Sequence, residues 1–167
     1  KGLRYIAGTV HASAVTLADA LNQLGVYQTN TSFFDTLNLK ADANKVQQVA
    51  LEHEVNFYYP DAETVVLSVN ETTSINDLNA IVAIFAKAMG KDAVKIQELS
   101  TWVALPESLK RTSDFLKHDV FNKYHSETAL MRYMKALERK DLALNHSMIS
   151  LGSCTMKLNA AAEMLPL

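Results

Sequence analysis

The sequence has little or nothing of the features that mark several protein classes. It contains one cysteine in 167 residues, so no internal disulfide can form, and a reducing compartment is expected. No apolar run approaches the roughly 20 residues that span a bilayer, and no signal-peptide pattern opens the chain. The formal net charge is −2 and the basic residues are dispersed, which argues against a nucleic-acid surface.

The residues that are present predict a folded, globular chain. Apolar residues make up 49% of the sequence and charged residues 20%, enough to bury a core and too little charge for disorder. The length suits one domain, or one domain with an appendage. The chain opens "KGLRYIAG" without a methionine and stops at "EMLPL" soon after a polar cluster, so we expect a fragment of a larger protein.

Helix and strand patterns follow one another up to residue 90. Their predicted order is helix, strand, helix, strand, strand, helix, over residues 9–25, 30–40, 42–53, 55–59, 64–70 and 74–90. Helices on one face of a small, largely antiparallel sheet would bury their apolar stripes. The predicted fold class is therefore α+β, a small two-layer sandwich.

Two of these helices carry strong boundary signals. "TVHASAVTLADALNQLG" places Val10, Ala14, Leu17, Leu21 and Leu24 on one face. Gly25 is its expected stop, as Gly90 is for the last helix. That last helix begins at Ser74, with Asp77 placed for a capping box. Its predicted buried stripe is Ile75, Leu78, Ile81, Val82, Phe85 and Met89.

The signals between these helices are mixed. Asp42 is expected to cap the second helix, whose apolar positions are Val46, Val49, Ala50 and His53. Asp35 interrupts the apolar face of the strand before it. Pro60-Asp61 is expected to break the strand "VNFYY". In "TVVLSVN", Val65, Leu67 and Val69 alternate as in a strand with one buried face.

Periodicity weakens after about Lys91. The following stretch contains the only tryptophan and predicts an irregular connector with short helical turns. Ser126 then caps a clear helix, and Asn159 is a second candidate cap near the carboxyl end. The predicted buried side of the Ser126 helix is Leu130, Tyr133, Met134 and Leu137.

The segment "HSMISLGSCTMKLNAAAEM" gathers polar residues around Cys154. A lone cysteine is commonly a small buried hydrophobe, but Gly152 permits close approach, and Ser153 and Thr155 add hydroxyls and N–H groups. Such a loop can hold a carboxylate or phosphate. Lys157 is either a surface or anion-facing lysine or a Schiff-base former. A redox-sensing thiol at Cys154 is a further alternative.

The histidines show no compact metal-ligand spacing, so no metal site is predicted. His125-Ser126-Glu127 spells H-x-E, but the P-C-x-x-C that would complete a zinc-deaminase signature is absent. The simpler interpretation is a helix cap, with Glu127 favourable at the helix start. Arg132 is placed either to form an ion pair with Glu127 or Glu138 or to clamp a carboxylate.

Two motifs together resemble the P-protein family of the glycine cleavage system. They are "VFNKYHSETALMRYMKALERKDLAL" and "SMISLGSCTMKLNAAAEM", supported upstream by "RTSDFLKHDVFNKYHSET" and, less diagnostically, by "KGLRYIAGTVHASAVTLADALNQLG". The strongest resemblance spans about Arg111 to Met164. The family usually reads "MIPLGSCTMK", whereas this chain has Ser150 at the proline position, which frees the backbone entering the loop.

The resemblance implies an organisation in two linked halves, each similar to a fold-type I aminotransferase. Residues 1–100 would be the small α+β domain that ends the first half, 101–125 a connector, and 126–167 the start of the second, catalytic half. The lysine that bears the cofactor lies downstream in the family, so Lys157 is not that lysine. The fragment alone is then expected to be inactive.

The resemblance also implies chemistry, partners and a site. The family uses pyridoxal phosphate to decarboxylate glycine and passes the aminomethyl group to the lipoyl arm of H-protein. Homodimers of the full-length chain and a cytoplasmic location, mitochondrial in eukaryotes, are expected. The expected pocket lining is Ser153, Cys154, Thr155 and Asn159, with His125, Glu127 and Arg132 behind it. The alternative is a non-catalytic small-ligand-binding or dimerisation α+β module.

Overall fold

The computed structural model describes residues 2–101 and 105–141. The chain divides into two compact units, Lys1–Arg111 and Thr112–Leu167, and each is considered by itself. Within the described residues, even the 22-residue helix α1 lacks the apolar character needed to cross a bilayer.

The first unit is built around one small antiparallel sheet. Its strands are β1 (Tyr27–Gln28), β2 (Thr36–Lys40), β3 (Tyr58–Asp61) and β4 (Thr64–Ser68), in the spatial order β1-β2-β4-β3. The longest pairing joins β2 to β4, with Leu37 opposite Leu67 and Leu39 opposite Val65. These four side chains are buried, so the central pair of strands presents one apolar face.

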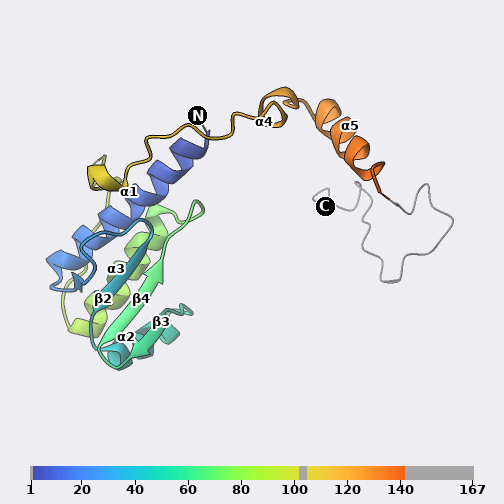
Figure 1. Ribbon diagram of the computed structural model, residues 1–167. Helices are drawn as coiled ribbons and strands as arrows, with labels where there is room; N and C mark the ends of the chain where they lie inside the picture. The colour runs from blue at the N-terminus through green and yellow to red at the C-terminus, as the bar shows by residue number, and fades with distance from the viewer. Residues whose placement is uncertain (1, 102–104, 142–167) are drawn as a thin grey trace. The chain divides into compact units, whose positions relative to one another are not determined.

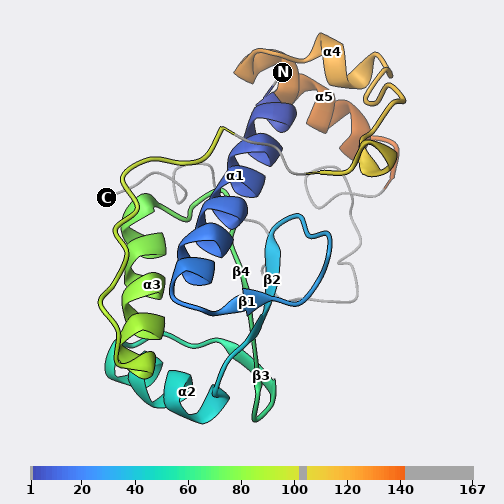
Figure 2. The same ribbon diagram turned by 90° about the vertical axis from the view of Figure 1, so that its left-hand side faces the viewer.

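Three helices cover that face. They are α1 (Gly2–Gln23), α2 (Ala43–Glu52) and α3 (Ile75–Met89), and Figures 1 and 2 show them on one side of the sheet. The buried side chains of the helices and strands form one cluster that includes Leu17, Leu21, Leu37, Val65 and Phe85. The predicted α+β sandwich of two layers is confirmed, with its core between helices and sheet.

Helix α1 agrees with its predicted stripe and stop. Every residue of the stripe is buried: Val10, Ala14, Leu17, Leu21 and Leu24. Gly25 follows the helix with φ +82°, and the Val26 N–H donates to the Leu21 carbonyl, which is how a left-handed glycine ends a helix. The helix begins at Gly2, about two turns before the predicted start at residue 9.

Helix α3 has the predicted capping box but a broader buried surface. Ser74 Oγ accepts the Asp77 N–H at 3.3 Å, and the Asp77 carboxylate accepts the Ser74 N–H at 2.7 Å. Ile84 and Ala86 are buried in addition to the predicted Leu78, Val82 and Phe85. The prediction for Met89 is wrong, since it is 38% exposed. The reason is that α3 contacts both α1 and α2, which moves the centre of its buried surface.

The strands differ from prediction at their ends. Residues 30–35 lie outside the strand predicted over 30–40, and β1 was not predicted, because two residues give no periodic signal. The prediction that Pro60-Asp61 breaks a strand over 55–59 is wrong, since β3 contains both residues. β3 lies at the sheet edge with an irregular register, so the missing N–H of proline costs no ladder bond there. The cap at Asp42 is confirmed, its side chain accepting the Lys45 N–H.

The stretch from Lys91 to Ser100 lies along the helices as a polar-tethered strap. Asn79 of α3 donates to the Ile96 carbonyl at 2.9 Å and accepts the Ile96 N–H at 2.8 Å. The Lys91 ammonium donates to the Leu24 carbonyl, and the Ser100 N–H donates to Thr16 Oγ1. Asn79 therefore replaces two backbone partners that the irregular strap cannot find in a sheet.

The second unit contains two described helices, α4 (Val120–Lys123) and α5 (Glu127–Glu138). The predicted cap is confirmed, since Ser126 Oγ accepts the Ala129 N–H at 3.2 Å. The predicted burial is wrong for Leu130, Met134 and Leu137, which are 47%, 60% and 43% exposed, whereas Tyr133 is half-buried. The physical reason is that no residue in the described range 112–141 is buried, so nothing there forms a core against this helix.

Replacing Phe85 by Ala should destabilise the first unit by about 3–5 kcal/mol, because a fully buried aromatic ring leaves a cavity. Met89→Ala on the same helix is the matched control and should change stability by less than about 0.5 kcal/mol. Urea unfolding followed by circular dichroism measures both. Equal effects of the two substitutions would contradict the described packing of α3.

Replacing Asn79 by Ala should destabilise the unit by about 1–3 kcal/mol, because both backbone groups of Ile96 lose their partner. The exposed neighbour Asn76→Ala is the control and should have little effect. Hydrogen exchange should show faster exchange at residues 92–100 in the Asn79 variant alone. Unchanged exchange there would show that the strap is held by other contacts.

Acid should weaken the start of α3 through Asp77. The Ser74 hydroxyl and N–H hold the pKa of this carboxyl below its ordinary value of 3.8. Because the pKa of Asp77 is lower in the folded state than in the unfolded state, the ionised carboxylate stabilises the fold at neutral pH. This stabilisation is lost as Asp77 becomes protonated, between about pH 5 and pH 2. Thermal unfolding of Asp77→Asn should therefore show a lower midpoint than wild type at pH 7, and the difference should shrink on acidification. A constant difference across that range would contradict the assignment.

Candidate functional site

The residues predicted to line the pocket lie outside the described part of the chain. Ser153, Cys154, Thr155 and Asn159 all fall beyond residue 141, as does Lys157. Their proposed role remains a prediction from the sequence. The helix expected to begin at Asn159 therefore also lies outside the described residues.

The three residues expected behind that pocket are described and lie at or on α5. His125 precedes the capping residue Ser126, and Glu127 occupies the first turn, where a carboxylate complements the helix dipole. Arg132 lies further along the same helix. All three side chains are exposed, so within the described residues they form no enclosed site.

Local contacts around α5 account for part of its sequence. The rings of Tyr124 and Tyr133 stack with centroids 4.2 Å apart and planes 16° apart, joining the helix to the segment before it. Lys135 forms an ion pair with Glu138 at 2.6 Å. The partner expected for Arg132 at Glu138 is thus engaged by a lysine of the same helix.

The described ranges 2–101 and 105–141 contain no group of three or more His, Cys, Asp or Glu side chains placed to hold a metal ion. His11, the one histidine that is buried there, points into the interior of the first unit instead. Its Nδ1 lies 2.8 Å from the Phe34 carbonyl oxygen and must carry the hydrogen, because a carbonyl only accepts. Its ring stacks on that of Phe34 at 5.5 Å.

The sequence patterns alone assign His11 no structural role. The hydrogen bond from His11 Nδ1 to the Phe34 carbonyl fastens the loop before β2 to α1. The other ring nitrogen, His11 Nε2, is buried without a hydrogen-bond partner. The only available signal was its position next to Val10 on the helical stripe. That position favours burial, but it does not indicate which backbone group the ring meets.

Grooves of about 520–580 Å³ open on the described part of the first unit, and two of them border α1 or α3. One, of about 560 Å³, lies between α1 and the strap and is lined by polar side chains that include Asp19, Gln23, Lys95 and Glu98. The other, of about 580 Å³, is lined by residues 55–58, 66–68, Asp77, Ala80 and Ile81. The Asp77 carboxylate of the second groove is already engaged by Ser74 in the capping box of α3.

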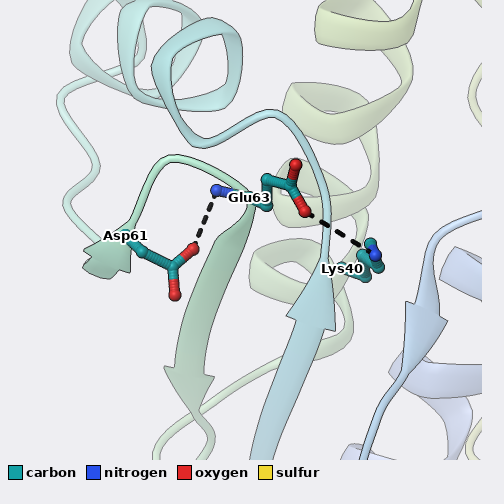
Figure 3. A network of polar contacts seen from close by, with 3 residues as sticks. All are labelled: Lys40, Asp61 and Glu63. Atoms are coloured by element: carbon teal, nitrogen blue, oxygen red, sulfur yellow. Dashed lines mark hydrogen bonds and ion pairs between the residues drawn. The ribbon is translucent and has the colours of Figure 1, made fainter.

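Surface charges near the end of the sheet are paired with close neighbours. Figure 3 shows Lys40 facing Glu63, with Nζ and Oε2 3.6 Å apart, while Asp61 accepts the Glu63 N–H at 2.8 Å. The side chain of Lys87 lowers the pKa of Glu52, 2.7 Å away, across from α3 to α2. These exposed pairs stabilise turns and helix contacts, and their solvent exposure is typical of structural ion pairs.

The described residues do not fit a pyridoxal phosphate site. A phosphate needs converging N–H groups or cationic side chains in a sheltered place. The unpartnered buried side-chain atoms that can donate a hydrogen bond are Gln28 Nε2 and Tyr59 OH, on β1 and β3 at opposite edges of the sheet. Burial raises the pKa of the Tyr59 phenol, so this hydroxyl stays neutral. The two donors cannot converge on one group.

Comparison with known proteins identifies the family. The family model described as "Glycine cleavage system P-protein" matches residues 1–85, just over half of the 167 residues. The chain is 70% identical over its whole length to a "Glycine dehydrogenase (decarboxylating)" of Flavobacterium johnsoniae. It is 61% identical to the protein of that description from Christiangramia forsetii and 47% identical to one from Bacteroides fragilis, again across the whole chain.

The chain spans 18% of the length of each of these curated relatives. The match includes the carboxyl-terminal motifs as well as the sandwich, because the aligned region covers all 167 residues. The family match falls on the α+β unit, of which the quoted motifs covered only residues 1–25. On these two grounds, the chain belongs to the P-protein family of the glycine cleavage system.

Proposed function

We propose that this chain is part of a glycine dehydrogenase that decarboxylates glycine within the glycine cleavage system. The observation that carries the proposal is the 70% identity, over all 167 residues, to a protein described as glycine dehydrogenase (decarboxylating). Glycine and the lipoyl arm of H-protein are then the substrates of the whole enzyme. A cytoplasmic location and a homodimer of the full-length chain complete the proposal.

In this proposal the sandwich is a supporting domain and the chemistry takes place elsewhere in the polypeptide. Residues 1–100 form the small domain that ends the first half, 101–125 connect, and 126–167 open the catalytic half. The continuous core of the first unit supports the proposal that residues 1–100 form a folded domain. The described residues of this unit present no converging donors for an anion, which supports a non-catalytic role for the domain. Pyridoxal phosphate, when bound to the whole enzyme, supplies the electron sink for decarboxylation.

The polar turn near the carboxyl end is the part of this chain that we assign to the substrate pocket. Ser153 and Thr155 would donate to the substrate carboxylate or the cofactor phosphate, with Cys154 against the cavity and Asn159 at the start of the next helix. His125, Glu127 and Arg132 would lie behind them. Because these three side chains are exposed at the start of α5 or on it, they are accessible to contacts with other parts of the full-length enzyme.

The double substitution Ser153→Ala and Thr155→Ala in the full-length enzyme should lower kcat/KM for glycine by about 10–100-fold, the effect of losing hydrogen bonds to a charged group. The measurement is release of labelled carbon dioxide from carboxyl-labelled glycine. Thr128→Ala, on the exposed side of α5, is the control and should retain activity. Unchanged kinetics for the double variant would remove both hydroxyls from the pocket.

The 167-residue chain by itself should not decarboxylate glycine. Incubation with pyridoxal phosphate, borohydride reduction and peptide mass spectrometry should find no lysine modified stoichiometrically, because the described part offers no anion cradle to hold the cofactor beside one. A single fully modified lysine in the chain would contradict the assignment of the cofactor to the rest of the enzyme. Glycine binding by the chain without cofactor would instead favour a ligand-binding module.

A further inference from the structure

The described part of the second unit has no core of its own. Between residues 112 and 141 no side chain is buried, whereas the first unit buries a continuous cluster from α1 to Ile96. A segment of this length gains too little from burial to offset the entropy of ordering it. The segment therefore needs further contacts if it is to keep its helices in solution.

Helix α5 carries the surface for such contacts. Leu130, Met131, Met134 and Leu137, here named the α5 apolar face, are 47%, 56%, 60% and 43% exposed. They recur at helical spacing along one side, and the opposite side carries Thr128, Arg132, Lys135 and Arg139. This division is typical of a helix that packs one side against a core.

Local interactions are too weak to explain the helix alone. Ser126 caps it, Glu127 complements its dipole, and Lys135 pairs with Glu138. Each of these is a small surface contribution, and an isolated helix of 12 residues is marginal in water. Packing of the apolar face is the contribution that is missing from residues 112–141.

We propose that the α5 apolar face is an intramolecular docking surface, covered in the full-length enzyme by chain that follows residue 167. The inference rests on the proposed function, in which residues 126–167 open the catalytic half. The relatives match this chain through α5 to its end, and 18% of their length is all that it spans. Most of a relative's chain is therefore available to cover the face.

A second copy of this chain is a poorer occupant. Stable dimers bury roughly 800 Å² on each partner. Four side chains on one 12-residue helix, about half exposed already, supply far less than that area. A covering layer from the same polypeptide needs no such minimum, because the connection removes the entropic cost of association.

Hydrogen exchange tests the proposal directly. In the full-length enzyme the amides of residues 130–138 should exchange about 100-fold more slowly than in the 167-residue chain, because a packed helix exchanges only after local opening. The α1 amides in both proteins provide the internal reference. Equally fast exchange of α5 in the two proteins would overturn the proposal.

Two matched substitutions test the face. Met134→Lys should speed exchange of α5 and lower the thermal midpoint of the full-length enzyme, whereas Ala136→Lys adds the same charge on the opposite, exposed side of α5 and should do neither. If Met134→Lys prevents folding, Leu130→Ala removes apolar contact without a charge and should still speed exchange of α5. Equal behaviour of the Lys variants, or no effect of Leu130→Ala, would overturn the assignment.

Two further outcomes separate this proposal from its rivals. Concentration-dependent protection of α5 in the 167-residue chain, abolished by Met134→Lys, would make a second copy the occupant and overturn the proposal. A full-length protein that decarboxylates glycine with unprotected α5 would refute the docking and leave the function standing. Protected α5 in a protein without glycine activity would refute the function and support the docking.

Discussion

The first unit depends on the burial of the α1 stripe against α3 and the central strands. Leu17 and Leu21 of α1, Phe85 of α3, and Leu37 and Val65 of the sheet all belong to the same buried cluster. Hydrophobic burial of this kind is non-directional and sets the layers, but it does not by itself hold the loops that join them. Without this burial, neither the packing of α1 against α3 nor the short sheet would be stable.

Directional polar contacts then attach the irregular segments to that core. Asn79 satisfies both backbone groups of Ile96 and fixes the strap, while His11 fixes the loop before β2 through the Phe34 carbonyl. In both cases a helix side chain substitutes for a missing sheet partner. The unit therefore consists of an apolar core to which polar side chains fasten the irregular segments.

Some features of the candidate site could be predicted from neighbouring residues, whereas others depend on contacts with distant parts of the polypeptide. The cap at Ser126 and the placement of Glu127 were predictable, because an N-cap depends on residues within one turn. The exposure of Leu130 and Met134 was not, because a stripe shows that a helix packs without showing whether its partner is present. The segment around Cys154 was recognised as a motif from its sequence, and it lies outside the described residues.

The sequence by itself determined the features that arise from neighbouring residues: the caps at Asp42 and Ser74, the stop at Gly25, and the resemblance that the family comparison confirmed. Only the tertiary structure decided which faces are covered. Ile84 is buried and Met89 is exposed because α3 packs against two helices. Pro60 lies within a strand because that strand is at the edge of the sheet. Burial and pairing depend on contacts between distant residues, and no local pattern specifies those.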